Sequence, residues 1–276
     1  MPTAWRTTFA VHDDHPVRAT ILRNATVNLI LLESRELDES GRVRLSDHRA
    51  DHLTRVLRVS PGDSVRVGVI DGPRGVAIVE STAGRPIELR CVLDEVPPPR
   101  PRVDVLLALP RPKVMRRLWA QIAALGVHRI MITNAERVER DYFDAHVLTA
   151  PCYEPLLLEG LQQARDTRRP LVSIHRRFRV LIEDDLDALA GPSLRLVAHP
   201  GAPAPITAAI AAAARERRGQ RVLVAIGPEG GWNSFETDLL EAHGFLPASM
   251  GGRTLRTDTA TVALLAIVHD ALGPSD

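Results

Sequence analysis

The sequence is poor in lysine, cysteine and aromatic residues, and it contains no long hydrophobic run. Cys91 and Cys152 are its two cysteines, too few and too far apart for a disulfide framework or a zinc site. We therefore expect no bound metal, and reduced thiols in a cytoplasmic protein. No apolar run approaches the roughly 20 residues that span a bilayer. Residues 1–20 lack the apolar segment of a secretory signal, so we expect no membrane partner.

An excess of charge of one sign is also missing. The 35 basic and 34 acidic residues leave a net charge of +1, which gives no argument for a nucleic-acid partner. Lys113 is the single lysine, so 34 of the 35 cations are arginine. Arginine suits bidentate phosphate contacts, but a GC-rich genome produces the same bias. The length of 276 residues suits one large or two ordinary domains.

A glycine-rich loop follows an apolar run near the C-terminal end of the chain. Residues 222–226 are short and β-branched, which predicts a buried strand. The run stops at Gly227–Gly231, where glycines permit close backbone approach. Asn233 and Glu236 have the spacing of a capping box, which predicts that a helix begins there.

A second glycine loop follows a second expected strand. This strand covers residues 245–250 and stops at Gly251 and Gly252. Thr257 or Asp258 is expected to cap a final helix that runs to residue 272. Two glycine loops at two strand ends suggest a small-molecule site beyond the carboxyl ends of the strands. Two tight turns in an ordinary α/β sheet explain the same spacing.

The rest of the chain divides at a proline-rich stretch, residues 96–102, which is stiff and marks a domain boundary. Before it, short strands separated by turns predict a small barrel. These strands are expected over residues 27–32, 43–45, 64–70, 75–80 and 87–93, with a helix over 47–56. After it, strands and helices alternate, which predicts a mostly parallel sheet covered on both faces. The strands are expected over 103–109, 129–133, 171–174 and 194–198, and the helices over 113–125, 153–163 and 205–218.

The glycine loops carry a family resemblance. Residues 227–231 read GPEGG and residues 250–260 read MGGRTLRTDTA. Together they strongly resemble the ribosomal RNA small subunit uracil-N3 methyltransferases of the SPOUT superfamily, which show GPEGG after a strand and then a loop leading into L-R-x-E-T-A. Residues 52–63 are similar to the family's N-terminal barrel motif, and residues 108–127 to the first strand and helix of its catalytic domain.

The resemblance covers residues 27–272 and implies an α/β fold. We expect a SPOUT-type parallel sheet with a C-terminal trefoil knot, preceded by a small PUA-like β-barrel. The implied domains are an N-terminal extension over residues 1–26, a PUA-like RNA-binding domain over 27–98 and a methyltransferase domain over 99–276.

The implied activity is methylation of uridine N3 in 16S ribosomal RNA of the small ribosomal subunit, with S-adenosylmethionine as cofactor and a homodimer as the assembly. Two alternatives stay open: a SPOUT ribose 2′-O-methyltransferase, and a non-catalytic RNA-binding ribosome-assembly factor. The N-terminal barrel and the LRTDTA segment weigh against the first.

The resemblance also implies the site residues. Three loops are expected to bind the cofactor through Ala198, His199, Pro200, Ile226, Gly227, Glu229, Gly231, Met250, Gly251 and Leu255. Arg256 is the expected catalytic residue, because uracil N3 must lose its proton and a nearby arginine stabilises the resulting anion. The alternative for Arg256 is a salt bridge to Asp258. That aspartate replaces the glutamate usual in the family, which leaves the identity of the target nucleotide open.

Cations on both sides of the domain boundary are the expected RNA contacts: Arg55, Arg58, Arg111, Lys113 and Arg165. Arg55 and Arg58 are three residues apart, which places them on one face of a helical turn. Arg111 and Lys113 at a helix start oppose the helix dipole, which mildly indicates an anionic ligand. Further arginines follow at 168, 169, 176, 177 and 179. A solvated, charged surface explains each group as well.

Overall fold

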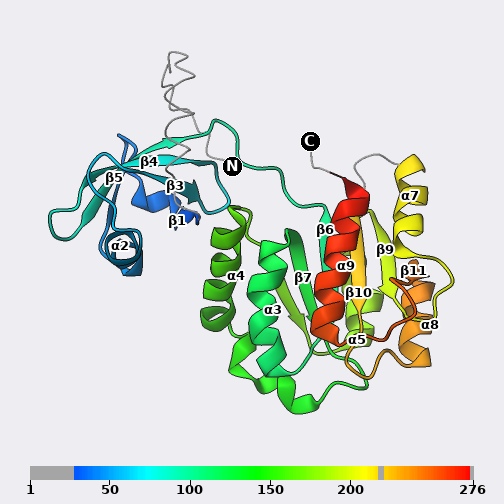
Figure 1. Ribbon diagram of the computed structural model, residues 1–276. Helices are drawn as coiled ribbons and strands as arrows, with labels where there is room; N and C mark the ends of the chain where they lie inside the picture. The colour runs from blue at the N-terminus through cyan, green and yellow to red at the C-terminus, as the bar shows by residue number, and fades with distance from the viewer. Residues whose placement is uncertain (1–27, 217–220, 274–276) are drawn as a thin grey trace.

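Two β-sheets, joined by an irregular segment over residues 94–102, organise the chain (Figure 1). The computed structural model describes residues 28–216 and 221–273. The N-terminal extension expected over residues 1–26 lies outside the described residues. In the described part, no helix is both long and apolar enough to cross a bilayer.

The first sheet has five strands in the order β1-β3-β4-β5-β2. Its neighbours pair in antiparallel fashion, except that β1 and β3 are parallel. The strands are β1 (Ile30–Leu32), β2 (Arg42–Leu45), β3 (Ser64–Val69), β4 (Arg74–Ser81) and β5 (Ile87–Leu93). The sheet curls around its own apolar core (Figure 1). Among the described residues its edge strands β1 and β2 do not pair with each other, so a curled sheet stands where a barrel was expected.

The helix expected over residues 47–56 is two segments rather than one. Helix α2 (His48–Asp51) is capped by Asp47, which accepts from the Arg49 amide at 2.9 Å. A π-helical segment, His52–Val56, follows it directly. Arg58 lies beyond this segment with φ of 52°, in the left-handed region. The expectation that Arg55 and Arg58 share one helical face is therefore wrong.

The second sheet has six strands, all parallel, in the order β11-β9-β10-β6-β7-β8. All six residues of β6 are buried, which requires cover on both faces of the sheet. The strands are β6 (Val103–Ala108), β7 (Val127–Thr133), β8 (Leu171–His175), β9 (Ser193–Ala198), β10 (Arg221–Ile226) and β11 (Phe245–Ala248). The main helices are α3 (Pro112–Ala124), α4 (Ala150–Ala164), α7 (Ile206–Glu216), α8 (Ser234–Ala242) and α9 (Thr257–Leu272).

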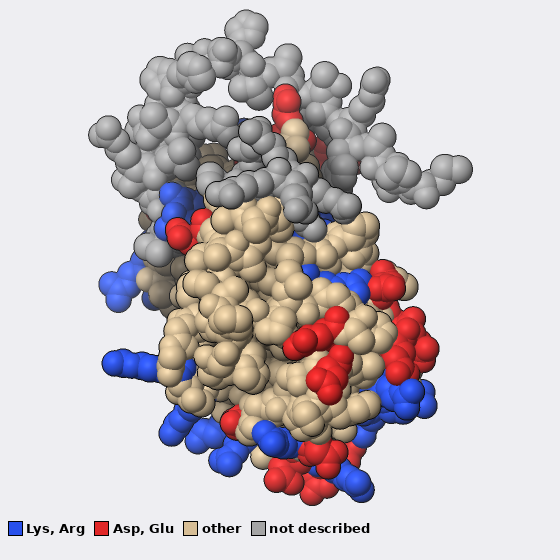
Figure 2. All heavy atoms as spheres, turned by 90° about the vertical axis from the view of Figure 1, so that its right-hand side faces the viewer, with Lys and Arg blue, Asp and Glu red and all other residues tan. Residues whose placement is uncertain are grey.

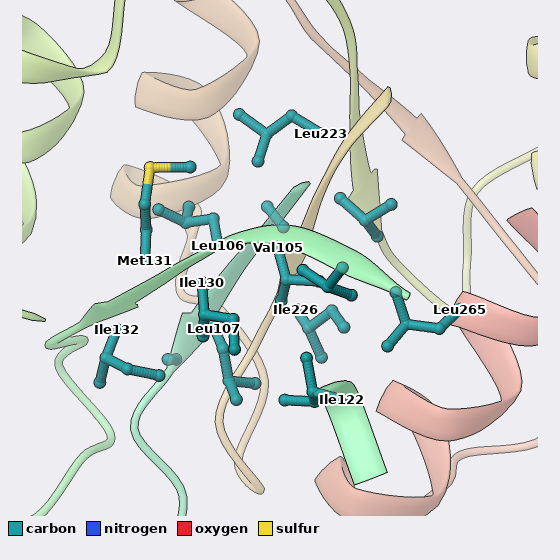
Figure 3. Close-up of a cluster of buried hydrophobic side chains, with 14 of the residues drawn as sticks. Val105, Leu106, Leu107, Ile122, Ile130, Met131, Ile132, Leu223, Ile226 and Leu265 are labelled. Atoms are coloured by element: carbon teal, nitrogen blue, oxygen red, sulfur yellow. The ribbon is translucent and has the colours of Figure 1, made fainter. Parts of the chain in front are cut away.

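Helices α3, α4 and α9 lie side by side in front of this sheet (Figure 1). Figure 3 shows the core between them and the strands: β-branched and leucine side chains of β6, β7 and β10 meet Ile122 of α3 and Leu265 of α9. Helices α3 and α4 approach so closely that a Cβ on Gly160 would lie 2.1 Å from the Ala120 carbonyl oxygen. A glycine in this helix therefore serves packing rather than flexibility.

A helical segment over residues 178–190 was not expected from the sequence. It comprises α5 (Phe178–Val180), a π-helical segment (Leu181–Asp185) and α6 (Leu186–Ala190). Phe178, Leu181, Ile182 and Leu186 are buried in the large core. Their spacing of three and four residues is helical, and the flanking arginines obscured it.

The two domains share strand β1 and a short polar junction. Leu29 and Leu31 pack into the core of the large sheet, while Ile30 and Leu32 pack into that of the small one. This follows from the alternation of side chains along a strand. Next to it, the buried Thr167 hydroxyl donates to the Gly72 carbonyl at 2.7 Å. The domains are therefore in direct packing contact.

Candidate functional site

Three loops at the carboxyl ends of β9, β10 and β11 surround a cavity of about 270 Å³. Its lining comes from residues 198–200, 226–232, 248, 250–251 and 253–255, together with Arg137 and three residues of α9, Thr257, Ala260 and Leu264. All ten residues predicted to bind the cofactor line it: Ala198, His199, Pro200, Ile226, Gly227, Glu229, Gly231, Met250, Gly251 and Leu255. The carboxyl edge of an open parallel sheet is the usual ligand site of such folds.

The second loop requires glycine for steric reasons. A Cβ on Gly227 would lie 3.1 Å from the Trp232 indole nitrogen, and Gly231 has φ of 73°. The loop ends in the predicted capping box: the Glu236 amide donates to Asn233 at 2.8 Å and the Asn233 amide donates to Glu236 at 2.9 Å. Local hydrogen bonds thus hold the loop between β10 and α8.

Contacts from distant segments fix the same loops. The buried Glu236 carboxylate also accepts from the Glu136 amide, after β7, at 2.6 Å. The Thr257 hydroxyl at the start of α9 donates to the Gly227 carbonyl at 3.3 Å. Ser249, after β11, donates from its amide to the Ala204 carbonyl at 2.9 Å. The three loops and the segment after β7 therefore form one packed unit.

The cavity combines an apolar wall with a few polar groups. Ile226, Met250 and Leu264 supply apolar surface. Trp232 is 8% exposed, and its indole nitrogen is buried with no hydrogen-bond partner among the described residues. The charged side chains on the lining are Arg137, Glu229 and Arg253. Such a lining suits a small ligand with a flat apolar part and polar edges.

Arg256, the predicted catalytic residue, lies at the N-cap of α9 and is exposed. It is absent from the cavity lining, although Leu255 and Thr257 on either side of it belong to that lining. Asp258 pairs with Arg117 at 3.1 Å, and no pair between Asp258 and Arg256 occurs in the described part of the chain. No side chain caps α9, so neither Thr257 nor Asp258 has the predicted capping role.

The predicted RNA contacts lie outside this cavity. Arg55 is 79% exposed and pairs weakly with Asp51 at 3.4 Å. Arg111 is the N-cap of α3, and Lys113 is exposed in its first turn. Arg165 is the left-handed C-cap of α4 with φ of 57°. The structure thus distributes these cations over both domains.

Other arginines of the basic group over residues 165–179 have protein partners. Arg168 bridges the domains by donating to the Pro98 carbonyl at 2.5 Å and the Asp71 carbonyl at 2.9 Å. Burial, followed by repulsion from Arg100, lowers the pKa of its guanidinium. In the same group, Arg176 pairs with Asp144 and Arg179 with Glu183. Arg168 is therefore structural, whereas Arg176 and Arg179 are exposed, and an RNA contact of these two stays a prediction.

Arg137 is a lining residue that sequence reasoning missed. It follows β7, and its guanidinium donates to the carbonyl of Gly230 in the second loop. The 93 residues between the two partners mean that no local pattern pointed to this contact.

The domain that contains the large sheet matches a known protein family. Residues 97–269 match the model of an RNA methyltransferase domain. The chain belongs to the RNA methyltransferase family. Residues 45–90 match an RNA methyltransferase PUA domain, which accounts for most of the curled sheet. The three cavity loops all lie within the RNA methyltransferase domain.

Relatives of the RNA methyltransferase family align over most of the chain. The ribosomal RNA small subunit methyltransferase E of Treponema pallidum is 30% identical over 88% of this chain and 90% of its own. The protein of the same name from Mycobacterium tuberculosis is 27% identical over 84% of this chain and 88% of its own.

Among solved structures, a ribosomal RNA small subunit methyltransferase E of Neisseria gonorrhoeae bound to S-adenosylmethionine is similar, with a TM-score of 0.67 and 19% identity over 87% of this chain and 96% of that one. At this identity the similarity shows a common fold.

Proposed function

We propose that this protein methylates N3 of a uridine in 16S ribosomal RNA, with S-adenosylmethionine as the methyl donor. The observation that carries the proposal is the convergence of the three loops on one cavity within the RNA methyltransferase domain. Relatives that align over nearly the whole chain are named ribosomal RNA small subunit methyltransferases.

The cavity fits the proposed cofactor. Its apolar wall of Ile226, Met250 and Leu264 suits an adenine ring. The indole N–H of Trp232 is buried beside Gly227 and has no hydrogen-bond partner among the described residues, which is consistent with an acceptor on a bound ligand. When bound, the cofactor supplies an electrophilic methyl group on a sulfonium.

The residues of the chain then place and activate the base. Methyl transfer to N3 requires alignment of the reacting atoms, so fixed loops contribute much of the rate. The N3 position carries a proton between two carbonyl groups, and a cation near the base favours loss of that proton. We propose Arg256 for this role, since it is exposed and unpaired among the described residues and adjoins two lining residues.

Arg256→Ala should lower turnover and leave cofactor affinity nearly unchanged, because the interaction forms in the transition state. Arg256→Lys should recover only part of the rate, since the ammonium group of lysine does not replace the planar guanidinium group, which donates two parallel hydrogen bonds. Calorimetry with S-adenosylmethionine and a thermal unfolding scan provide the check. Loss of cofactor binding, or a sharp fall in melting temperature, would show Arg256 to be structural.

The PUA domain and the cations around it are proposed to position the RNA. Arg55, Arg58, Arg111, Lys113 and Arg165 would contact phosphates, which fix register without reading sequence. The double variant Arg55→Ala, Arg58→Ala should reduce the salt slope of RNA affinity by about two units, one per contact. An unchanged slope and affinity would exclude the PUA domain from RNA positioning.

The finer architecture is likewise proposed. We infer domains over residues 27–98 and 99–276, with closure of the curled sheet into a barrel and a trefoil knot formed by the three loops. Support for the knot comes from Ser249, whose segment runs parallel to Pro205 and bonds to residues 204 and 206. An experimental structure that traces residues 198–257 tests it.

The proposed assembly is a homodimer in the cytoplasm. Figure 2 shows the face that carries α7 and α8; much of it is uncharged, acidic side chains lie near its middle, and most other charged side chains lie towards its margins. Phe235 of α8 and Leu246 of β11 are exposed apolar side chains, 55% and 51% accessible. A second copy would cover such surface. Light scattering of the purified protein measures the assembly directly.

Mass spectrometry of ribosomal RNA nucleosides from a deletion strain, with and without the restored gene, tests the activity. The proposal predicts that 3-methyluridine disappears from the small-subunit RNA and returns on complementation. Loss of a 2′-O-methylated nucleoside instead would establish the ribose methyltransferase. No change in any methylated nucleoside, together with failure to bind S-adenosylmethionine, would indicate a non-catalytic assembly factor.

A further inference from the structure

Arg137 is a cation that a long-range contact holds at the edge of the cavity. Its guanidinium donates to the Gly230 carbonyl, and the lining includes both residues. A Cβ on Gly230 would lie 2.8 Å from the Arg137 Cδ, so the aliphatic stem lies directly over this glycine. This inference rests on the proposed function: we propose that Arg137 faces the acceptor uridine and, in addition to Arg256, stabilises the negative charge that develops on its base.

The segment that carries Arg137 is itself anchored. The amide of the preceding residue, Glu136, donates to the buried Glu236 carboxylate at 2.6 Å. That carboxylate also belongs to the capping box that starts α8. The position of Arg137 is thus set from both the β7 side and the second loop. A charge that is fixed before reaction costs no reorganisation during it, which makes it effective in catalysis.

The guanidinium retains donors for a ligand. Of its five N–H groups, one bonds to Gly230, and the others have no protein partner within the described residues. Arg137 is exposed, so these donors are accessible. The planar guanidinium group can donate hydrogen bonds to the carbonyl oxygens of a deprotonated uracil, whose negative charge is spread over two carbonyl groups. The other charged groups on this cavity are Glu229 and Arg253.

Arg253 differs from Arg137 in its contacts. It lines the same cavity and is exposed, but it has no hydrogen bond or ion pair to any described residue. An unanchored side chain loses more conformational entropy when it binds a ligand. Arg256, by contrast, is absent from the lining. Arg137 is therefore the arginine that is both fixed and on the lining.

Arg137 assists the deprotonation of uracil N3 that precedes methyl transfer. The uracil N3–H proton leaves to water at the open edge of the site, and the ring becomes an anion. The N3 lone pair forms a bond to the methyl carbon while the carbon–sulfur bond breaks, with its electron pair remaining on sulfur. Arg137 keeps its own protons throughout and only lowers the pKa of N3 in the complex.

The experiment compares the wild type with Arg137→Ala, Arg137→Lys and Arg44→Ala; Arg44 is an exposed arginine of β2 that pairs with Glu88 at 3.0 Å and is absent from the cavity lining. The substrate is small ribosomal subunits from the deletion strain, and S-adenosylmethionine is saturating. Arg137→Ala should lower kcat by about 100-fold, the usual cost of losing one preorganised donor, whereas Arg44→Ala should change it by less than about threefold. Arg137→Lys should keep the melting temperature and cofactor affinity of the wild type but stay below its kcat.

Two readouts separate charge stabilisation from a structural role. The pH at which kcat levels off should rise by about two units in Arg137→Ala, because N3 then ionises less readily and each pKa unit corresponds to about a tenfold change in rate. Subunits that carry 5-fluorouridine, whose N3–H is more acidic, should restore much of the lost rate. If both Arg137 variants change only melting temperature or cofactor affinity, with kcat and its pH profile unaltered, the inference is overturned. Absence of 3-methyluridine with the wild-type protein would instead contradict the proposed function itself.

Discussion

Thr167→Val tests whether one buried hydroxyl holds the two domains together. Thr167 is fully buried at the junction, and its hydroxyl donates to the Gly72 carbonyl at 2.7 Å. Its own carbonyl accepts from the Asp71 amide at 2.8 Å. Its methyl group lies 2.5 Å from the position that a Cβ on Gly68 would take. Valine keeps this shape and removes only the hydroxyl donor.

The expected cost follows from the carbonyl that is left behind. Gly72 is buried, and its carbonyl oxygen has no second donor among the described residues. An unsatisfied buried acceptor costs about 1–3 kcal/mol, so we expect the free energy of unfolding to fall by about 2 kcal/mol. For a chain of this size the melting temperature should fall by roughly 4–8 °C.

Urea unfolding monitored by circular dichroism measures this change. Thr54→Val is the matched control, because the Thr54 hydroxyl also donates to a carbonyl, that of Ala50 at 2.9 Å, but on an exposed helix. The control should stay within about 0.5 kcal/mol of the wild type. If both variants unfold at the same urea concentration, the junction hydroxyl does not contribute to holding the domains together.

Two further predictions concern the core. Gly160→Ala should destabilise the protein by about 2 kcal/mol in urea unfolding, because the Cβ would lie 2.1 Å from the Ala120 carbonyl oxygen and overpacking outweighs the gain in helix propensity. Ala120→Gly should not rescue it, since the clash is with backbone; a variant as stable as wild type contradicts the reasoning. Burial, followed by repulsion from Arg221, lowers the pKa of His128 to about 4. In the unfolded chain a histidine has a pKa of about 6.5, so between pH 6.5 and 4 the unfolded state binds more protons than the folded state. The free energy of unfolding should therefore decrease as the pH is lowered from 6.5 to 4, by at most about 3 kcal/mol. His128→Asn should remove that part of the slope, and an identical slope in both proteins would refute the assignment.

The sequence by itself determined most of the elements and indicated the location of the cavity. Runs of buried apolar residues predicted most strands of the large sheet, and the Asn233–Glu236 capping box was confirmed in detail. These features depend on residues within a few positions of one another, so a local pattern suffices. The glycine loops at strand ends indicated the carboxyl edge of the sheet, because glycine permits the conformations and close contacts found there.

The tertiary structure decided which charged side chains face that cavity and which hold the fold. Sequence reasoning placed Arg168 among the RNA contacts, whereas it bridges the domains through Pro98 and Asp71. It overlooked Arg137, whose partner Gly230 lies 93 residues away. An arginine has the same sequence signature whether it binds a carbonyl, an acid or a phosphate. Its role is set by the partner that the folded chain brings within hydrogen-bonding distance, and that partner comes from a distant part of the sequence.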